Sequence, residues 1–84
     1  MGFSIEWSKT AEKALGKLPN TVAARIACKV TEIQANPFRY LEHYEGEDTF
    51  KLRVDEYRLL IDADFIHRLL AIRVVGHRSK VYKR

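Results

Sequence analysis

The N-terminal part of the chain begins with a strand pattern and continues with a helical one. Residues 3–7 alternate between apolar and polar side chains, which is typical of a strand with one buried face. Ser8 then suits the N-cap of a helix, and apolar residues recur at spacings of three and four across residues 11–18. Pro19 should end this helix, because proline disfavours helical geometry in the residue before it.

A second and longer helix follows directly. We expect Asn20 or Thr21 to cap its start and Asn36-Pro37 to stop it. Its apolar residues fall along one face at helical spacing: Val22, Ile26, Val30 and Ile33. Because the link between the two helices is short, the pattern predicts an antiparallel helical hairpin.

After the helices the period of the apolar positions changes to two. Residues 38–48 are of mixed character and are interpreted as a loop. Residues 50–54 and 57–61 alternate cleanly, and a third apolar run covers residues 69–75 and should end at Gly76. Three strands joined by short turns predict an antiparallel meander.

The order of elements therefore reads as strand, helix, helix and then three or more strands. Helices that are segregated from a run of antiparallel strands indicate the α+β class. The length of 84 residues suits a single domain, residues 1–84. We expect two layers, with both helices on one face of the sheet and the other face open to water or to a ligand.

The first hairpin of the meander gathers cations on that open face. A turn at Asp55-Glu56 would place Arg53 directly opposite Arg58, with Lys51 on the same face. The other face would be the core face, formed by Phe50, Leu52, Val54, Tyr57, Leu59 and Ile61. Because opposed like charges are destabilising, we interpret the two arginines as an anion site. The competing interpretation is that both side chains splay into solvent.

The net charge of +4 is unevenly distributed. Residues 1–50 hold six Lys/Arg and seven Asp/Glu, whereas residues 51–84 hold nine Lys/Arg and four Asp/Glu. A gradient of this kind indicates a polyanion or an acidic partner for the C-terminal half. A solvated basic surface that keeps the protein soluble would have the same composition.

The tail of the chain, residues 76–84, mixes cations with a histidine and a tyrosine. Arg78 and Lys80 could bind phosphate, His77 could join them, and Tyr82 could stack on an RNA base. Such a set suits metal-free RNA cleavage, in which Lys, Arg, His and Tyr can move the protons and stabilise the charged phosphorane. The alternative is a frayed basic terminus.

Several function classes have no support in the sequence. Cys28 is the only cysteine, so an intramolecular disulfide and a Cys-rich zinc site are excluded. The three histidines are scattered and the four glycines isolated, so no metal, P-loop or dinucleotide motif is present. No apolar run is long enough for a membrane span and no signal peptide is visible. We therefore expect a cytoplasmic protein with no cofactor, no metal and no membrane partner.

Two segments resemble the RelE/ParE toxin superfamily. Residues 50–59 resemble the central hairpin of that superfamily, and residues 73–78, followed by Val81-Tyr82, resemble its final strand and tail. The resemblance implies a RelE-like fold and the toxin of a type II toxin–antitoxin pair. RelE-type members cut mRNA in the ribosomal A site, whereas ParE-type members share the fold and poison DNA gyrase.

The resemblance also implies roles for individual residues. Lys51 matches a lysine that contacts the reacting phosphate, and Arg58 matches the arginine that stabilises the transition state. Arg78 matches an arginine assigned to the phosphate or the leaving group, and Tyr82 a tyrosine that stacks on the mRNA. Arg53 would bind the RNA backbone.

The chain departs from the family pattern at one position that matters for the chemistry. Thr49 stands where many RelE members have a second lysine, which is proposed as the general base. His77 is a candidate to replace it, because histidine titrates near neutrality; otherwise it is a hydrogen-bonded residue at a strand end. The spacing from Arg78 to Tyr82 is also two residues shorter than in some members.

The leading hypothesis from the resemblance is a ribosome-dependent, metal-independent endoribonuclease that acts on mRNA, with an acidic RelB-like antitoxin as its partner. One alternative is a ParE-like toxin that inhibits gyrase by binding it. Another is a catalytically weak RNA-binding relative of the enzyme, which the substitution at Thr49 favours.

Overall fold

The computed structural model describes residues 2–46 and 48–81. It has the α+β composition that the sequence predicts, with three α-helices and a five-stranded sheet. The elements follow in this order: β1 (Ser4–Trp7), α1 (Lys9–Gly16), α2 (Asn20–Ile33), the 3-10 helix η1 (Pro37–Arg39), β2 (Glu42–Glu45), β3 (Thr49–Val54), β4 (Tyr57–Asp64), β5 (Leu69–His77) and α3 (Arg78–Val81).

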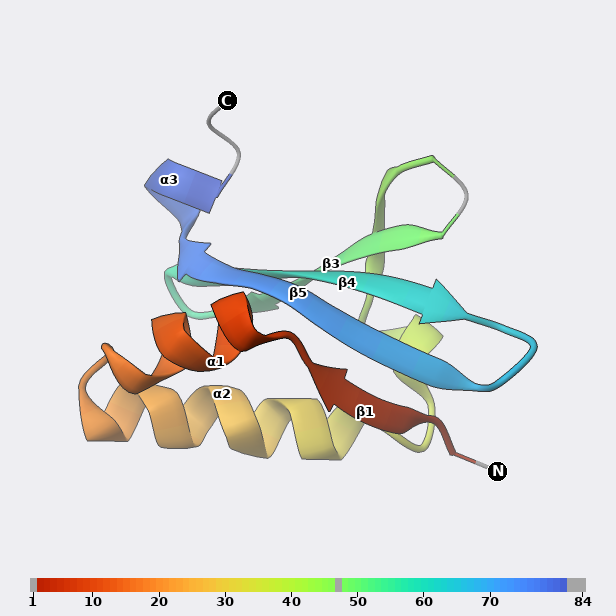
Figure 1. Cartoon of the computed structure of the whole chain (residues 1–84), viewed down its shortest axis with the longest axis horizontal. Helices are drawn as coiled ribbons and strands as arrows, with labels where there is room; N and C mark the ends of the chain where they lie inside the picture. Colours follow the sequence, from red (N-terminus) through yellow and green to blue (C-terminus); the bar gives the residue numbers. More distant parts are fainter. Residues whose placement is uncertain (1, 47, 82–84) are drawn as a thin grey trace.

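The sheet is mixed, with the strand order β1-β5-β4-β3-β2. The predicted meander is confirmed, because β3, β4 and β5 pair antiparallel in sequence order. β1 is an edge strand of the sheet and pairs parallel with β5. The helices α1 and α2 lie together on one side of the sheet (Figure 1). The prediction of a loop over residues 38–48 was wrong in part, because residues 42–45 form β2 and pair antiparallel with β3.

The register between β3 and β4 is the predicted one. Arg53 is paired with Arg58, and Lys51 with Leu60. The predicted core face is confirmed: its members are either buried or packed against the buried core, as are Phe50, Leu52, Val54, Tyr57, Leu59 and Ile61. The side chains of this face pack with α2 and with β5, whose Leu70 and Ile72 are completely buried.

The helix boundaries were predicted in part. Ser8 caps α1 as expected, because its Oγ accepts a hydrogen bond from the backbone N–H of Ala11 at 3.0 Å. The expected cap of α2 at Asn20 or Thr21 is wrong. Pro19 itself holds the N-cap position in an extended conformation, and its carbonyl accepts the N–H of Ala23 at 2.9 Å, so the helix begins immediately after the proline.

The C-terminal end of the sheet carries a short helix that the sequence pattern did not predict. β5 continues through Gly76 to His77, and α3 starts at the next residue. The backbone N–H of Arg78 donates to the carbonyl of Glu56 at 2.8 Å, which joins α3 to the β3–β4 turn. A Cβ at Gly76 would lie 2.8 Å from Cγ2 of Val81, so α3 approaches β5 as closely as it does because residue 76 has no side chain.

The opposite end of the sheet, at the β4–β5 turn, has its own polar cap. The carboxylate of Asp64 accepts the backbone N–H groups of His67 and Ile66, and it contacts the His67 ring. These contacts, chiefly the backbone hydrogen bond from His67, lower the pKa of Asp64 below its usual value of 3.8. The lowered pKa of Asp64 therefore reflects contacts within the β4–β5 turn and not contacts at the end of the sheet where α3 lies.

The close approach at Gly76 gives a testable consequence. We expect Gly76→Ala to push α3 away from β5 and to lower the free energy of unfolding by about 1–2 kcal/mol, because the added methyl overpacks the contact with Val81. Hydrogen exchange should show faster exchange of the α3 amides, and urea unfolding should give the change in stability.

Gly16→Ala is the matched control. Nothing lies within 4 Å of a Cβ at Gly16, the last residue of α1. Alanine there should raise stability by about 0.5–1 kcal/mol, since glycine is a poor helix former. Equal stability changes in the two variants would contradict the close packing of α3.

Candidate functional site

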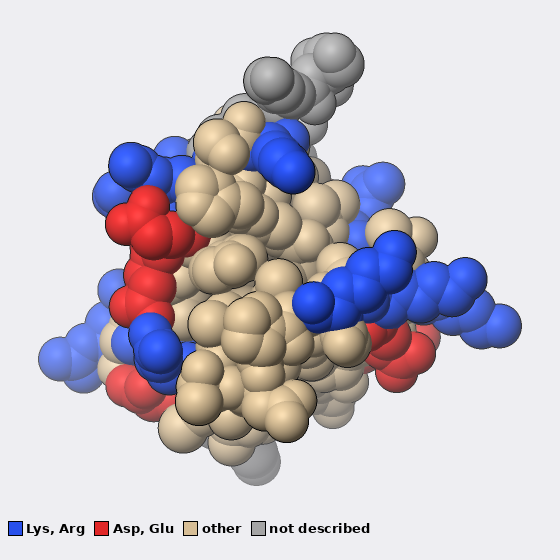
Figure 2. Space-filling view, turned by 90° about the vertical axis from the view of Figure 1, so that its left-hand side faces the viewer, with Lys and Arg blue, Asp and Glu red and all other residues tan. Residues whose placement is uncertain are grey.

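Basic side chains lie on several sides of the molecule. Figure 2 shows Lys and Arg residues at the left, at the right and near the top of the face in view, and Asp and Glu residues lie between those on the left. The neighbouring Asp and Glu residues affect ligand binding. A Lys or Arg that already pairs with a carboxylate binds a phosphate less readily than a Lys or Arg without a carboxylate partner.

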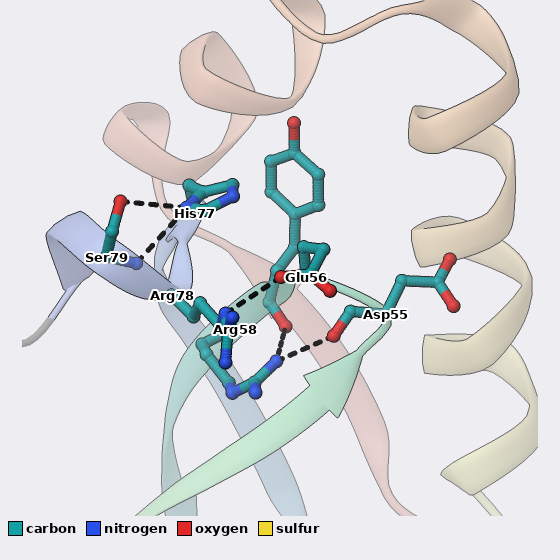
Figure 3. A network of polar contacts seen from close by, with 7 residues as sticks. Asp55, Glu56, Arg58, His77, Arg78 and Ser79 are labelled. Atoms are coloured by element: carbon teal, nitrogen blue, oxygen red, sulfur yellow. Dashed lines mark hydrogen bonds and ion pairs between the residues drawn. The ribbon is translucent and has the colours of Figure 1, made fainter.

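Residues of β3, the start of β4, the end of β5 and the start of α3 border an open surface pocket of about 470 Å³. Its lining consists of four cations, one imidazole and one hydroxyl: Lys51, Arg53, Arg58, Arg78, His77 and Ser79. Three strands and a helix, from residues 51 to 79, thus bring the predicted cations to one place. Arg58 and Arg78 face the same pocket and lie close to each other in Figure 3.

Arg58 is the buried member of this set, with only 7% of its surface exposed. Its Nη1 donates to two backbone carbonyl oxygens of the β3–β4 turn, those of Asp55 at 2.9 Å and Tyr57 at 2.8 Å (Figure 3). Arg58 also pairs with Gly76 across β4 and β5. Cross-strand partners point to the same face, so α3, which packs over Gly76, covers the neighbouring arginine as well.

The charge of Arg58 is not neutralised within the part of the chain that the structure describes, where no carboxylate forms an ion pair with it. Burying a charge is unfavourable unless it is paired and hydrogen-bonded. The two carbonyl oxygens satisfy part of the guanidinium, and the rest of it borders the pocket. The geometry therefore leaves room for a negatively charged group beside the guanidinium, on the side that faces the pocket.

The three more exposed cations each have an internal partner. Glu42 of β2 lies 3.5 Å from Nζ of Lys51 and 3.6 Å from Nη1 of Arg53, and Glu56 lies 2.8 Å from Nε of Arg78. Ion pairs of this exposed kind contribute about 0–1 kcal/mol each. A phosphate can therefore replace or share these partners at little cost.

His77 has a defined orientation. Its Nδ1 accepts the backbone N–H of Ser79 at 3.2 Å and lies 2.8 Å from the Ser79 hydroxyl (Figure 3). The ring of Tyr57 meets it edge-on, with the centroids 5.6 Å apart. Because a nitrogen that accepts a backbone N–H carries no proton, the neutral ring holds its proton on Nε2. His77 is thereby a hydrogen-bond donor at Nε2, and its Nδ1 is already occupied.

Lys80 and Thr49, two further positions that the sequence analysis considered, lie outside the pocket lining. Lys80 is exposed on α3 and is not part of the lining. Tyr82 lies outside the described residues. Thr49 donates its hydroxyl to the carboxylate of Asp62 at 2.9 Å and borders a separate pocket of about 130 Å³ that also involves Arg73.

The sequence analysis did not identify three residues of this region: Glu42, Glu56 and Ser79. Glu42 lay in a segment interpreted as a loop, Glu56 in a turn and Ser79 in an unassigned tail. The only available signal was the acidic Asp55-Glu56 turn between two basic strands. In the described ranges 2–46 and 48–81, no group of three metal-ligating side chains is present, and no helix is long and apolar enough to cross a membrane.

Comparison with known families settles the broad identity. The family described as "ParE toxin of type II toxin-antitoxin system, parDE" matches residues 5–82, nearly the whole chain. The chain belongs to this family. It is thus a toxin of the RelE/ParE superfamily, as the two sequence segments suggested. No curated protein sequence matches it at a significant level.

Solved structures agree on the fold of this RelE/ParE toxin. A chain of the toxin–antitoxin complex RelBE2 from Mycobacterium tuberculosis is 28% identical, with 95% of each chain covered and a TM-score of 0.84. The archaeal RelE–RelB complex from Pyrococcus horikoshii OT3 contains a chain that is 19% identical, with 96% of this toxin and 100% of that chain covered and a TM-score of 0.83. A mutant of E. coli RelE in the free state is 20% identical, with 96% and 88% covered and a TM-score of 0.82.

The tautomer of His77 can be tested directly. We expect ¹⁵N-resolved NMR of the imidazole to show a protonated Nε2 and an unprotonated Nδ1 in the neutral ring, because the N–H of Ser79 points at Nδ1. Ser79→Ala should keep this tautomer, since the backbone donor remains. A ring protonated at Nδ1 would contradict the geometry described here.

Proposed function

We propose that this toxin is a ribosome-dependent endoribonuclease that cleaves mRNA in the ribosomal A site without a metal ion. The observation that carries the proposal is the buried guanidinium of Arg58, which faces a pocket lined by three further cations and has no carboxylate partner among the described residues. A phosphodiester supplies the negative charge that this pocket lacks, and arginine binds phosphate oxygens with its planar fork of donors.

The reaction we propose is attack of a 2′-hydroxyl on the adjacent phosphate, which gives a 2′,3′-cyclic phosphate and a 5′-hydroxyl. Negative charge grows on the phosphorane oxygens in the transition state, and fixed donors stabilise it there. Arg58 and Arg78 would supply most of this stabilisation. Lys51 and Arg53 would hold the phosphate and the neighbouring backbone, and the Nε2–H of His77 would donate to an oxygen of the substrate.

The roles proposed for Tyr82 and Lys80 do not depend on the geometry of the pocket. Tyr82 would stack on a base of the mRNA, a role that comes from the family resemblance alone. Lys80 would contact RNA outside the pocket, since its side chain is exposed on α3.

We further propose an acidic RelB-like antitoxin as the protein partner. Several of the similar solved structures are RelE proteins in complex with RelB. The cation-lined pocket of this toxin suits an acidic segment. A ribosomal substrate would place the toxin in the cytoplasm.

A second candidate function is inhibition of DNA gyrase by binding. It is favoured by one specific observation, namely that the matching family is the one described by the ParE toxin. A third, an RNA-binding relative with weak activity, is favoured by Thr49, which is engaged with Asp62 outside the cation pocket.

Cell-free translation with mapping of mRNA 5′ ends distinguishes these candidates. We expect the toxin to produce cuts within codons of the translated frame. Arg78→Ala and Arg58→Lys should each lower the cleavage rate by about 10²–10³-fold, as the loss of one fixed donor to a developing anion does. Lysine at position 58 is used because alanine would also remove the hydrogen bonds to the turn.

Arg73→Ala is the control for these variants. Arg73 is exposed, pairs with Asp62 at 3.1 Å and does not line the cation pocket, so cleavage should remain within about twofold of the parent protein. Gyrase-dependent DNA breaks without mRNA cuts would favour the ParE-like function. Binding to RNA or ribosomes with no cuts would favour the non-catalytic relative.

A further inference from the structure

The pocket supplies phosphate binding, but it does not by itself supply a proton acceptor. Of its described lining residues, four are cations, and Ser79 is not basic. His77 has the obvious chemistry, yet its Nδ1 already accepts the backbone N–H of Ser79, which in the neutral ring leaves the proton on Nε2. Cleavage through the 2′-hydroxyl needs a group that removes that proton, so the acceptor has to come from the rim of the pocket.

Two carboxylates lie on the rim, and they differ in how they are held. Glu56 accepts the Nε–H of Arg78 at 2.8 Å, a full hydrogen bond that occupies one of its oxygens. Glu42 lies 3.5 and 3.6 Å from its two cations, beyond the usual hydrogen-bond distance. The lone pairs of Glu42 are therefore less committed, and its side chain remains 47% exposed and open to a ligand.

The sheet fixes the position of Glu42 relative to the phosphate site. β2 pairs with β3 so that Glu42 is the cross-strand partner of Lys51. Cross-strand partners share a face, so this carboxylate lies on the same open face as the cations of β3. Its two oxygens are divided between Lys51 and Arg53, both of which line the pocket.

The spacing suits an RNA nucleotide. The 2′-hydroxyl that attacks belongs to the sugar directly attached to the scissile phosphate. The protein group that accepts its proton must therefore lie about one sugar away from the groups that bind the phosphate. Glu42 suits this requirement, because it lies beside Lys51 and Arg53, the two residues to which the proposed function assigns the phosphate and the neighbouring backbone. Arg58 and Arg78 lie farther across the sheet, on β4 and α3, and would hold the phosphate from that side.

We propose that Glu42 is the general base of the toxin. This inference rests on the proposed nuclease function. The carboxylate takes the proton of the 2′-hydroxyl while the 2′-oxygen forms a bond to phosphorus. The bond from phosphorus to the 5′-oxygen breaks, and that oxygen takes a proton from solvent water. Glu42 then returns its proton to solvent, so that no net charge is gained or lost.

The same arrangement gives Lys51 and Arg53 a second role. Between turnovers they hold the Glu42 side chain at the rim of the pocket. When a phosphate enters, they can contact the phosphate and Glu42 together, which places the base beside the substrate. The threonine at position 49 is then compatible with catalysis, because the base comes from β2 instead of from β3.

Glu42→Gln tests the proposal, since glutamine keeps the shape of the side chain and removes its basicity. We expect the cleavage rate at saturating toxin on stalled ribosomes to fall by about 10²–10⁴-fold, the usual contribution of a general base. Binding of a non-cleavable mRNA with a 2′-O-methyl group at the cut site should be unchanged or tighter, because a negative charge beside the phosphate is lost.

Glu56→Gln is the matched carboxylate variant. It also touches a pocket cation, so a purely electrostatic role of the rim carboxylates would make the two variants behave alike. We expect Glu56→Gln to cost less than about tenfold in cleavage rate, in line with a weak exposed ion pair. Thermal unfolding of both variants shows whether either has lost its fold.

The outcomes separate the two proposals. If the parent toxin makes no mRNA cuts, the nuclease function itself fails. If the parent cleaves and folded Glu42→Gln cleaves within threefold of it, the nuclease function stands and Glu42 is not the base. Equal losses in Glu42→Gln and Glu56→Gln, or a loss explained by weaker binding of the 2′-O-methyl mRNA, would likewise overturn the assignment.

Discussion

The site depends on one buried charge and the turn that holds it. Arg58 enters the open face of the sheet from β4, and its guanidinium donates to the carbonyl oxygens of Asp55 and Tyr57. Asp55 adopts a positive φ of 55°, a conformation that aspartate tolerates better than most residues. The tight turn thereby presents its carbonyl groups to the arginine, and α3 over Gly76 covers it. The positive charge is ordered before any ligand arrives.

Around this fixed charge, the other cations are adjustable. Lys51, Arg53 and Arg78 are more exposed than Arg58, and carboxylates of the same chain hold them. Such an arrangement combines one buried donor, held by the turn, with three exposed side chains that can exchange partners. The acidic residues of the rim, Glu42 and Glu56, lower the net positive charge of the pocket.

The regular part of the fold could be predicted from the sequence. Alternation along residues 50–54 and 57–61, with two turn residues between them, determines both the register and the face of each side chain, since a slip by one residue would reverse every side chain. That is why the pairing of Arg53 with Arg58 was predicted correctly. The family match over residues 5–82 supports the same order of elements. The strand β2 was missed because four residues of mixed polarity form a strand only when β3 lies beside them.

By itself, then, the sequence determined the α+β class, the hairpin register and the residues that supply positive charge, because these follow from local periodicity and from residue type. Only the tertiary structure decided which cation is buried, which carboxylates lie against the others and which nitrogen of His77 accepts the N–H of Ser79. Those features depend on contacts between β2 and β3, between β4 and β5, and between α3 and the β3–β4 turn. Distances across such contacts are set by the packing of the whole sheet, which no local pattern encodes.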